Sequence, residues 1–211
     1  MIEYIIASNP DSRIVKKTAD MLKRGGLVAI PTDTSWAIIA SIGSKEGRDK
    51  LLDCMPLERR HAPTFICTDI QQTSEYCEIS DAVFRYIKKL VPGPFVFILR
   101  STNKIAKLFS LKRAEVGVRI PAHPVAHAII AELGVPLLAI TARKTMINKS
   151  SEPPQYPEEE LFDEAWELED IPGLDLIITG EENCDKKITT VIDLRTDEPI
   201  VIRQGAGIIE K

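Results

Sequence analysis

The sequence lacks the glycine-rich motifs with which many nucleotide-binding proteins hold phosphates. Neither G-x-x-x-x-G-K-[ST] nor G-x-G-x-x-G occurs among the 211 residues, which excludes a P-loop and a Rossmann phosphate loop. A G-x-S-x-G turn is also absent, and with three histidines in the chain we expect no Ser-His-Asp triad. Neither of the standard glycine-rich phosphate-binding loops is therefore present in this sequence.

Cysteine and histidine are scarce, which leaves little material for disulfides or metal sites. His123 and His127 have the i, i+4 spacing of a helix, but no Glu follows the first histidine and no third ligand is evident. We therefore predict no metal held by the protein. The four cysteines form no C-x-x-C pair, and we expect reduced, mostly buried thiols at Cys54, Cys67, Cys77 and Cys184.

Long apolar runs are missing as well. No stretch approaches the ~18 apolar residues of a membrane span. The first residues, MIEYIIASNPDSR, show neither a basic n-region nor a small-residue cleavage site. We expect a cytoplasmic protein without a membrane partner.

Charge is present in quantity but is unevenly distributed. Residues 152–182 hold twelve acidic side chains and no basic one, so the other 180 residues carry 27 basic against 19 acidic side chains, a net +8. This asymmetry favours an anionic partner such as a nucleotide or RNA, with the acidic segment as a solubilising helix or a shield. The alternative is a solvated surface of scattered charges, since no Lys/Arg run exceeds two residues.

The apolar pattern alternates strands with helices and predicts one mixed α/β domain over residues 1–211. An apolar content of 44% supports a buried core. We expect helices at 11–26, 45–55, 81–93, 105–110 and 123–134, an acidic amphipathic helix at 158–170, and irregular chain at 143–157. Strands are expected at 3–7, 27–30, 35–42, 64–69, 95–102, 115–120, 136–141, 174–179, 189–195 and 199–203.

Two details of these elements can be checked individually. The link TDEP between the last two strands is typical of an antiparallel hairpin, so the sheet should be mixed and twisted rather than purely parallel. The buried face of the helix at 81–93 should consist of Val83, Phe84, Ile87, Leu90 and Val91.

Polar side chains end or interrupt strands at five places in a similar way. Strand ends at one edge of an α/β sheet are a usual place for ligands. Hydroxyls bind phosphate or carboxylate oxygens as neutral donors, and guanidinium groups bind them as charged donors. Each residue has a plainer interpretation, as a local cap or a surface charge. Gathered in one cleft they would form an anion site, and the candidates are Thr32, Thr34, Arg119, Thr141, Arg143, Thr190 and Arg203.

Several blocks of sequence, in order, resemble the YrdC family of threonylcarbamoyl-adenylate synthases. They are GGLVAIPTDTSWAI, LVPGPFVFIL, VGVRIPAHPVAHAIIAELGVPLLAITA, ITTVIDL and PIVIRQGAG. The opening YIIASNPDSRIVKKTADMLKRGG and the length are most similar to the YciO-like branch of that family. The resemblance covers nearly the whole chain.

The resemblance implies a twisted mixed sheet around a concave, positively charged cavity. Family enzymes condense L-threonine, bicarbonate and ATP, with Mg²⁺ on the triphosphate, to threonylcarbamoyl-AMP and pyrophosphate for tRNA modification. Members are also described as double-stranded RNA binders. By motif, Thr32 and Thr34 would line the threonine and carbamoyl end, and Arg119 would face a carboxylate or phosphate. Thr190 and Arg203 would serve the nucleotide phosphates.

The chain departs from the family pattern at two motifs. The basic K-x-R motif and a following Asn align with Asp53, Met55 and Ala62, and the S-x-N motif reads Thr141-Ala142-Arg143. Replacing Lys by Asp reverses a charge meant to face phosphate, so ATP should bind poorly unless other cations compensate. The possible compensating residues are Arg59, Arg60, Arg143 and Lys144.

Two functions from different classes therefore stay open. One is an enzyme-like site that binds a nucleotide and L-threonine and makes threonylcarbamoyl-AMP. The other is a non-catalytic module that binds tRNA or double-stranded RNA on the same basic surface. A third and weaker interpretation gives the acidic residues 152–170 a role in contacting a protein.

Overall fold

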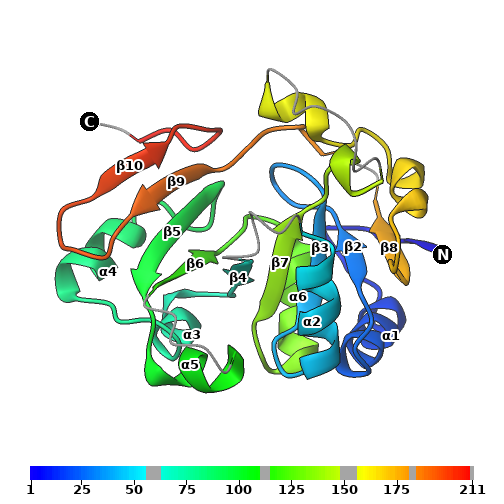
Figure 1. Cartoon of the computed structure of the whole chain (residues 1–211), viewed down its shortest axis with the longest axis horizontal. Coiled ribbons are helices and arrows are strands. Elements are labelled where there is room, and N and C mark those ends of the chain that lie inside the picture. The colour runs from blue at the N-terminus through cyan, green and yellow to red at the C-terminus, as the bar shows by residue number, and fades with distance from the viewer. Residues whose placement is uncertain (56–62, 110–114, 148–155, 181–183, 210–211) are drawn as a thin grey trace.

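The computed structural model describes the chain except for residues 56–62, 110–114, 148–155, 181–183 and 210–211. Within the described residues, one ten-stranded mixed sheet forms the centre of the molecule, with helices packed against it (Figure 1). The strand order is β1-β8-β2-β3-β7-β4-β6-β5-β9-β10. The predicted mixed α/β architecture is confirmed.

The strands fall where the apolar pattern places them, although most are shorter than predicted. Strands β3 and β7 are central, and nearly all of their residues are buried because both sheet faces are covered there. The bounds are β1 (Ile2–Tyr4), β2 (Val28–Ile30), β3 (Ala37–Ser41), β4 (Thr64–Ile66), β5 (Phe95–Arg100), β6 (Glu115–Arg119), β7 (Leu137–Thr141), β8 (Leu176–Thr179), β9 (Thr190–Asp193) and β10 (Ile200–Arg203).

Side-chain caps fix the starts of several helices. Asp11 accepts a hydrogen bond from the backbone N–H of Arg13 at 2.8 Å at the start of α1. Ser44 accepts from the Gly47 N–H at the start of α2, and Ser80 accepts from the Val83 N–H at the start of α4. The α-helices are α1 (Ser12–Lys23), α2 (Lys45–Asp53), α3 (Ile70–Ser74), α4 (Asp81–Ile87), α5 (Asn103–Phe109) and α6 (Pro124–Leu133), and the 3₁₀ turns are η2 (Lys144–Met146), η3 (Pro157–Glu160) and η4 (Ala165–Asp170).

Strand directions are mixed, as the hairpin link predicts. The pairs β1–β8, β2–β8, β4–β6 and β5–β9 are parallel, while β2–β3, β3–β7, β4–β7, β5–β6 and β9–β10 are antiparallel. The sheet twists strongly between its two halves (Figure 1).

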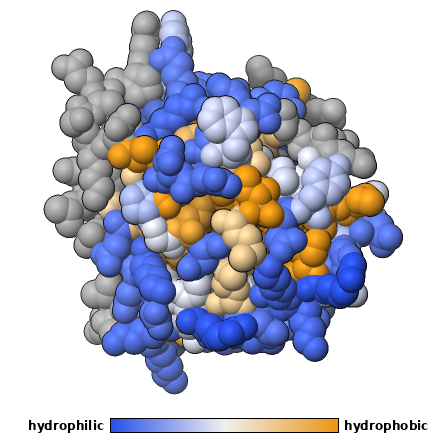
Figure 2. Space-filling view, turned by 90° about the vertical axis from the view of Figure 1, so that its right-hand side faces the viewer, coloured by the Kyte–Doolittle hydropathy of each residue, from blue (hydrophilic) through white to orange (hydrophobic). Residues whose placement is uncertain are grey.

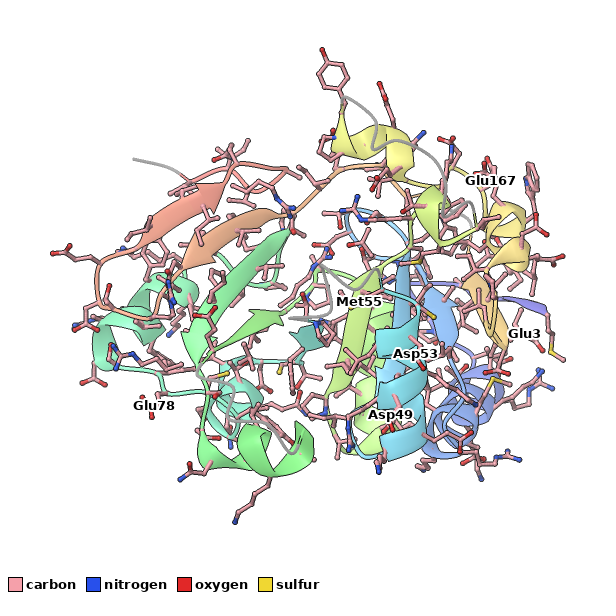
Figure 3. All side chains as sticks on the ribbon, viewed as in Figure 1. Glu3, Asp49, Asp53, Met55, Glu78 and Glu167 are labelled. Carbon is pink, nitrogen blue, oxygen red and sulfur yellow. The ribbon has the colours of Figure 1, made fainter. Side chains whose placement is uncertain are left out.

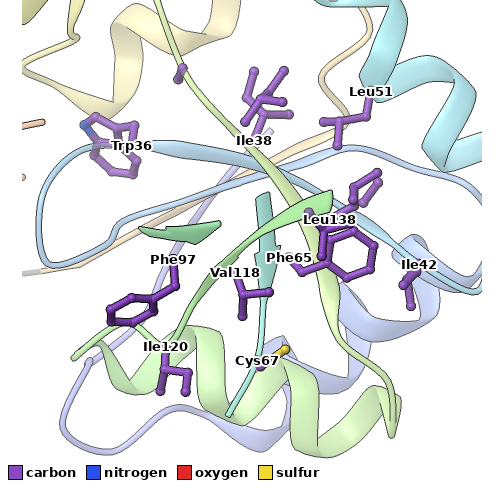
Figure 4. Packing of buried hydrophobic residues seen from close by; sticks show 14 of the residues in the cluster. Trp36, Ile38, Ile42, Leu51, Phe65, Cys67, Phe97, Val118, Ile120 and Leu138 are labelled. Carbon is purple, nitrogen blue, oxygen red and sulfur yellow. The ribbon is translucent and has the colours of Figure 1, made fainter. Parts of the chain in front are cut away.

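Each face of the sheet buries its own apolar cluster. One cluster contains Trp36, Phe65, Phe97 and Leu138, and α2 contributes Leu51 to it (Figure 4). On the other face α1 and α6 pack together and cover β2 and β3. Burial of these side chains, at roughly 25 cal/mol per Å² of apolar surface, is the main force that holds the sheet and helices together.

Two predicted elements are wrong. The acidic segment 158–170 is not one helix but two 3₁₀ turns, because the Glu167 carboxylate accepts hydrogen bonds from the N–H groups of Asp163 and Glu164 and starts a new turn there. In α4 the helix ends at Ile87, and Phe84 lies beside the buried Val83/Ile87 stripe with 42% of its surface exposed. Helix α3 was not predicted.

The face over β1 and η4 carries apolar side chains in its centre, surrounded by hydrophilic ones (Figure 2). Tyr4, Ile6 and Trp166 are all exposed, Trp166 by 66%. In the part of the chain that the structure describes, no helix is both long and apolar enough to cross a bilayer.

Candidate anion-binding site

The loop 31–36, which contains the sequence PTDTS, is built by its hydroxyls rather than by glycine. It joins the antiparallel strands β2 and β3, which pair Ile30 with Ala37. The hydroxyl of Thr32 donates to the Ser35 carbonyl at 2.7 Å and accepts from the N–H groups of Thr34 and Ser35, both at 3.3 Å. Thr32 and Thr34 are 4% and 1% exposed. The loop is therefore a fixed, buried wall and not a mobile turn.

Arg119, at the end of β6, crosses to this loop and ties it to the other half of the sheet. Its Nη2 donates to Asp33 Oδ1 at 2.5 Å, Thr34 Oγ1 at 2.9 Å and Thr32 Oγ1 at 3.4 Å. The second Asp33 oxygen accepts from the Ala122 N–H at 3.2 Å. Burial lowers the pKa of the Arg119 guanidinium, and the charge of Asp33 opposes that shift. The predicted grouping of Thr32, Thr34 and Arg119 is present.

One donor of this group has no acceptor. Within the described part of the chain, Arg119 Nε is buried and makes no hydrogen bond. A buried donor without a partner typically costs about 1–3 kcal/mol. The Nε–H of the guanidinium is therefore an unsatisfied donor beside the Nη2 group that binds the loop.

The segment that leads into β9 lies against the same loop. The Lys187 N–H donates to the Thr34 carbonyl at 3.1 Å. The Cys184 thiol lies beside the backbone of Thr32, and burial raises the pKa of this thiol to about 11. Since β9 begins only three residues after Lys187, this segment links the loop 31–36 directly to the second group of site residues.

That second group lies where β9 begins and β10 ends. Arg203 Nη2 donates to the carbonyl oxygen and the Oγ1 of Thr189, at 2.9 and 3.0 Å. The fully buried Thr190 hydroxyl donates to the Gly207 carbonyl at 2.8 Å and accepts from the Gly205 N–H at 2.9 Å. Thr190 thus holds the turn that follows Arg203.

The two glycines of this turn allow close backbone packing. A Cβ on Gly205 would lie 2.4 Å from the Ile188 carbonyl oxygen, and one on Gly207 would lie 2.4 Å from the Phe95 ring. Neither position has room for a side chain, so QGAG is a packing requirement of this corner of the fold.

Thr141 and Arg143 form the third part of the set. Thr141 ends β7 opposite Ala37, next to the loop 31–36. Arg143 forms a short ion pair with Glu160 of η3, and Glu160 is only 6% exposed. Burial is the main cause that lowers the pKa of the Arg203 guanidinium. The positive charge of Arg143 lowers this pKa further, and the negative charge of Glu158 raises it. Arg143, Arg203 and Glu158 therefore share one electrostatic environment.

The strand ends do not all meet at one edge of the sheet. Arg119 is in register with Ile66, which pairs with Leu137 at the start of β7, whereas Thr141 ends that strand. Arg119 nevertheless hydrogen-bonds to the loop 31–36, so the position of its strand end does not by itself predict this contact.

The residues that align with the family's basic motif contribute no positive charge. Asp53 is the last residue of α2, one turn after Asp49, and Met55 packs against the core cluster (Figure 3). Lys144, a candidate replacement, lies 3.9 Å from a Glu167 carboxylate oxygen. Arg59, Arg60 and Ala62 lie outside the described residues.

Three partners in the site could not be assigned from sequence alone. Asp33 stands inside PTDTS, but its partner Arg119 is 86 residues away. Glu160 is one of three consecutive glutamates, and nothing in the sequence distinguishes it from Glu159. Thr189 was visible only as the neighbour of Thr190.

Two further observations bound the chemistry. No group of three or more His, Cys, Asp or Glu side chains that could hold a metal occurs among the described residues. A groove of about 300 Å³ lies between α4 and the β5–β9 end of the sheet, and it includes none of the candidate residues; it is lined by Glu78, Ile79, Ser80, Val83, Arg100, Leu194, Arg195, Thr196 and Asp197.

Comparisons with known proteins agree with this architecture. A family model for Sua5, YciO and YrdC, described as "Telomere recombination", matches residues 20–205. The chain is 32% identical over 205 residues to "Uncharacterized protein YciO" of Escherichia coli (strain K12), covering 97% of this chain and 95% of that protein.

Solved structures give the same result. The crystal structure of E. coli YciO matches with a TM-score of 0.83 and 31% identity, over 99% of this chain and 97% of the other. P. abyssi Sua5 complexed with L-threonine matches with a TM-score of 0.77 and 22% identity, over 97% of this chain and 57% of the longer one. This protein is therefore a member of the Sua5/YciO/YrdC family.

Proposed function

We propose that this protein binds L-threonine and an adenine nucleotide in a site of the threonylcarbamoyl-AMP synthase type. The observation that carries the proposal is the buried constellation of Arg119 with Thr32 and Thr34, at 3.4 and 2.9 Å. Support comes from the structural neighbour Sua5, which was solved in complex with L-threonine.

At the amino-acid end, Arg119 is the main binding group. Its Nε lacks an acceptor, and a carboxylate oxygen is the strongest acceptor that a guanidinium can meet. A ligand carboxylate at Nε would satisfy the buried donor while Nη2 keeps its bonds to the loop. Thr32 and Thr34 then position Arg119, with Asp33 balancing its charge.

At the nucleotide end, Arg203 is the group that would face phosphate. Thr189 accepts two hydrogen bonds from Arg203 Nη2 and so orients the guanidinium, and Thr190 fixes the turn behind it. In the synthase reaction, a carbamate oxygen of N-carboxythreonine attacks the α-phosphorus of ATP and the bond to the β-phosphate breaks, releasing pyrophosphate. Such a step depends on positioning and charge neutralisation more than on a strong base, and Mg²⁺ would enter with its ATP.

The test is pyrophosphate release from ATP, measured with and without L-threonine and bicarbonate. We expect threonine-dependent release by the wild-type chain and its loss in Arg203→Ala. Arg13→Ala is the matched control, because the Arg13 side chain is 89% exposed and pairs with Asp11 on the surface. Release that does not depend on threonine, or that survives Arg203→Ala unchanged, would refute the synthase reaction.

RNA binding is the second candidate, and the net +8 outside residues 152–182 favours it. Part of that excess is neutralised within the protein, since Glu160 and Asp163 of the acidic segment pair with Arg143 and Lys186. The test is a titration with tRNA at several salt concentrations. If the protein binds the phosphate backbone of the RNA, its affinity for tRNA must fall steeply as the salt concentration rises. Binding that ignores salt, or none at low salt, would exclude this function.

A further inference from the structure

Two of the three arginines of the candidate site form an ion pair with a carboxylate of the protein. Arg119 pairs with Asp33 at 2.5 Å, and Arg143 pairs with Glu160. Arg203 makes its hydrogen bonds to Thr189, with the charge of Glu158 acting on it. Among the described residues, two of the three site arginines are therefore compensated by ion pairs, and the third is held by Thr189 with the charge of Glu158 acting on it.

Two of the three carboxylates come from the single turn η3, Pro157–Glu160. The glutamates of this turn differ in their surroundings. Glu160 is 6% exposed and pairs with Arg143, while Glu158 is half-buried near Arg203. Glu159, between them, is exposed and forms no ion pair with any residue that the structure describes. The turn therefore contributes one buried ion-pair partner, Glu160, and one half-buried charge, Glu158, that acts on Arg203.

The burial of Glu160 fixes this arrangement. If a phosphate drew Arg143 away, Glu160 would remain buried without a cation, which is strongly unfavourable in a poorly solvated position. Arg143 is consequently held by Glu160 and does not replace the basic residues that are missing at Asp53 and Met55.

We propose that Glu160, with Glu158 beside it, sets the charge of the nucleotide that this site accepts, favouring a monophosphate or a monophosphate ester over a triphosphate. This inference rests on the proposed function. AMP carries about two negative charges at neutral pH and each further phosphate adds about one. Where Arg119 and Arg143 already have counter-charges, the extra phosphates of ATP lose hydration and gain few uncompensated cations in return.

The experiment is calorimetric titration of the full chain with AMP, ADP and ATP in EDTA, so that no Mg²⁺ masks the phosphate charge. We expect wild-type protein to bind ATP no more tightly than AMP. Glu160→Gln keeps a hydrogen-bond acceptor for Arg143 but removes the charge, and it should raise the affinity ratio of ATP to AMP by about tenfold, or about 1.4 kcal/mol. Glu159→Gln is the matched control with the same change of charge, and it should leave the ratio unchanged.

The outcomes separate this inference from the proposed function. Wild-type protein that binds ATP at least tenfold more tightly than AMP, with a ratio that Glu160→Gln does not alter, overturns the inference and leaves nucleotide binding intact. Absence of binding for all three nucleotides refutes the proposed function itself. If Glu160→Gln does not fold, Glu158→Gln takes its place and should move the ratio in the same direction, and an unchanged ratio there also overturns the inference.

Discussion

Replacing Asp33 by Asn tests the buried ion pair that fixes the candidate site. The substitution keeps the shape of the side chain and an acceptor for the Ala122 N–H, but it leaves the Arg119 charge without a counter-charge. The two side chains are only 14% and 9% exposed, so solvent screens the pair weakly. Removing one partner of a buried pair costs about 3–5 kcal/mol, and the slight exposure of Asp33 places this case near the lower end, at about 3 kcal/mol.

The assay is thermal and urea unfolding of wild-type protein, Asp33→Asn and the control Asp11→Asn. For a chain of this length about 3 kcal/mol corresponds to a fall in Tm of roughly 6–12 °C. Asp11 pairs with an 89% exposed Arg13 on the surface, and Asn caps a helix as well as Asp does, so we expect Asp11→Asn to leave Tm unchanged. The double variant Arg119→Met/Asp33→Asn removes both charges and should recover much of the loss. A fall of less than about 1 kcal/mol for Asp33→Asn would refute the reasoning.

Three further predictions concern the rest of the fold. Burial raises the pKa of the Cys67 and Cys77 thiols to about 12. The native state therefore keeps these protons at a pH where unfolded thiols, with a pKa near ~8.5, have lost them, so the free energy of unfolding should fall as pH rises from about 9 to 12. Urea titrations over this range should show a shallower fall for Cys77→Ala than for wild type, and equal slopes would contradict the burial of this thiol. Gly207→Ala should destabilise the protein by about 1–3 kcal/mol, because the new Cβ would meet the Phe95 ring. Gly43→Ala is the control and should cost much less, because the nearest atom to its Cβ would lie 3.5 Å away. Similar losses of stability in the two variants would argue against the packed turn after Arg203. Acrylamide should quench the fluorescence of Trp166, which is 66% exposed, but not that of Trp36, which is 1% exposed. Trp166→Phe should therefore abolish most of the quenching. Quenching that persists in this variant would mean that Trp36 is accessible.

Local sequence signals predict much of the fold because each depends on neighbouring residues. The cap of α1 at Asp11, the Gly134 end of α6 and the β9–β10 hairpin are decided within a few positions. The two errors also arise within a few residues, where the apolar pattern alone does not decide the outcome. The Glu167 carboxylate accepts hydrogen bonds from the N–H groups of Asp163 and Glu164, which starts a new turn inside the predicted acidic helix. In α4 the buried residues are Val83 and Ile87, and Phe84 lies beside them.

The candidate site could be predicted only as residue types. The hydroxyls of PTDTS and the guanidinium of VRIP were visible in the sequence, and Arg119 does contact Thr32 and Thr34. The carboxylates that balance the arginines were not visible, because the pairs Asp33–Arg119 and Glu160–Arg143 are created by tertiary folding across 86 and 17 residues. For this reason two of the three arginines that the sequence predicts for the site are paired with carboxylates in the part of the chain that the structure describes.

Calorimetric titration of L-threonine into wild-type protein and Arg119→Gln tests the central claim most directly. If the buried Arg119 binds the ligand carboxylate, wild-type protein will bind threonine and Arg119→Gln will not, while Arg13→Gln binds as wild type does. Absence of threonine binding to wild-type protein in the presence and absence of AMP, or undiminished binding to a folded Arg119→Gln variant, would contradict the account.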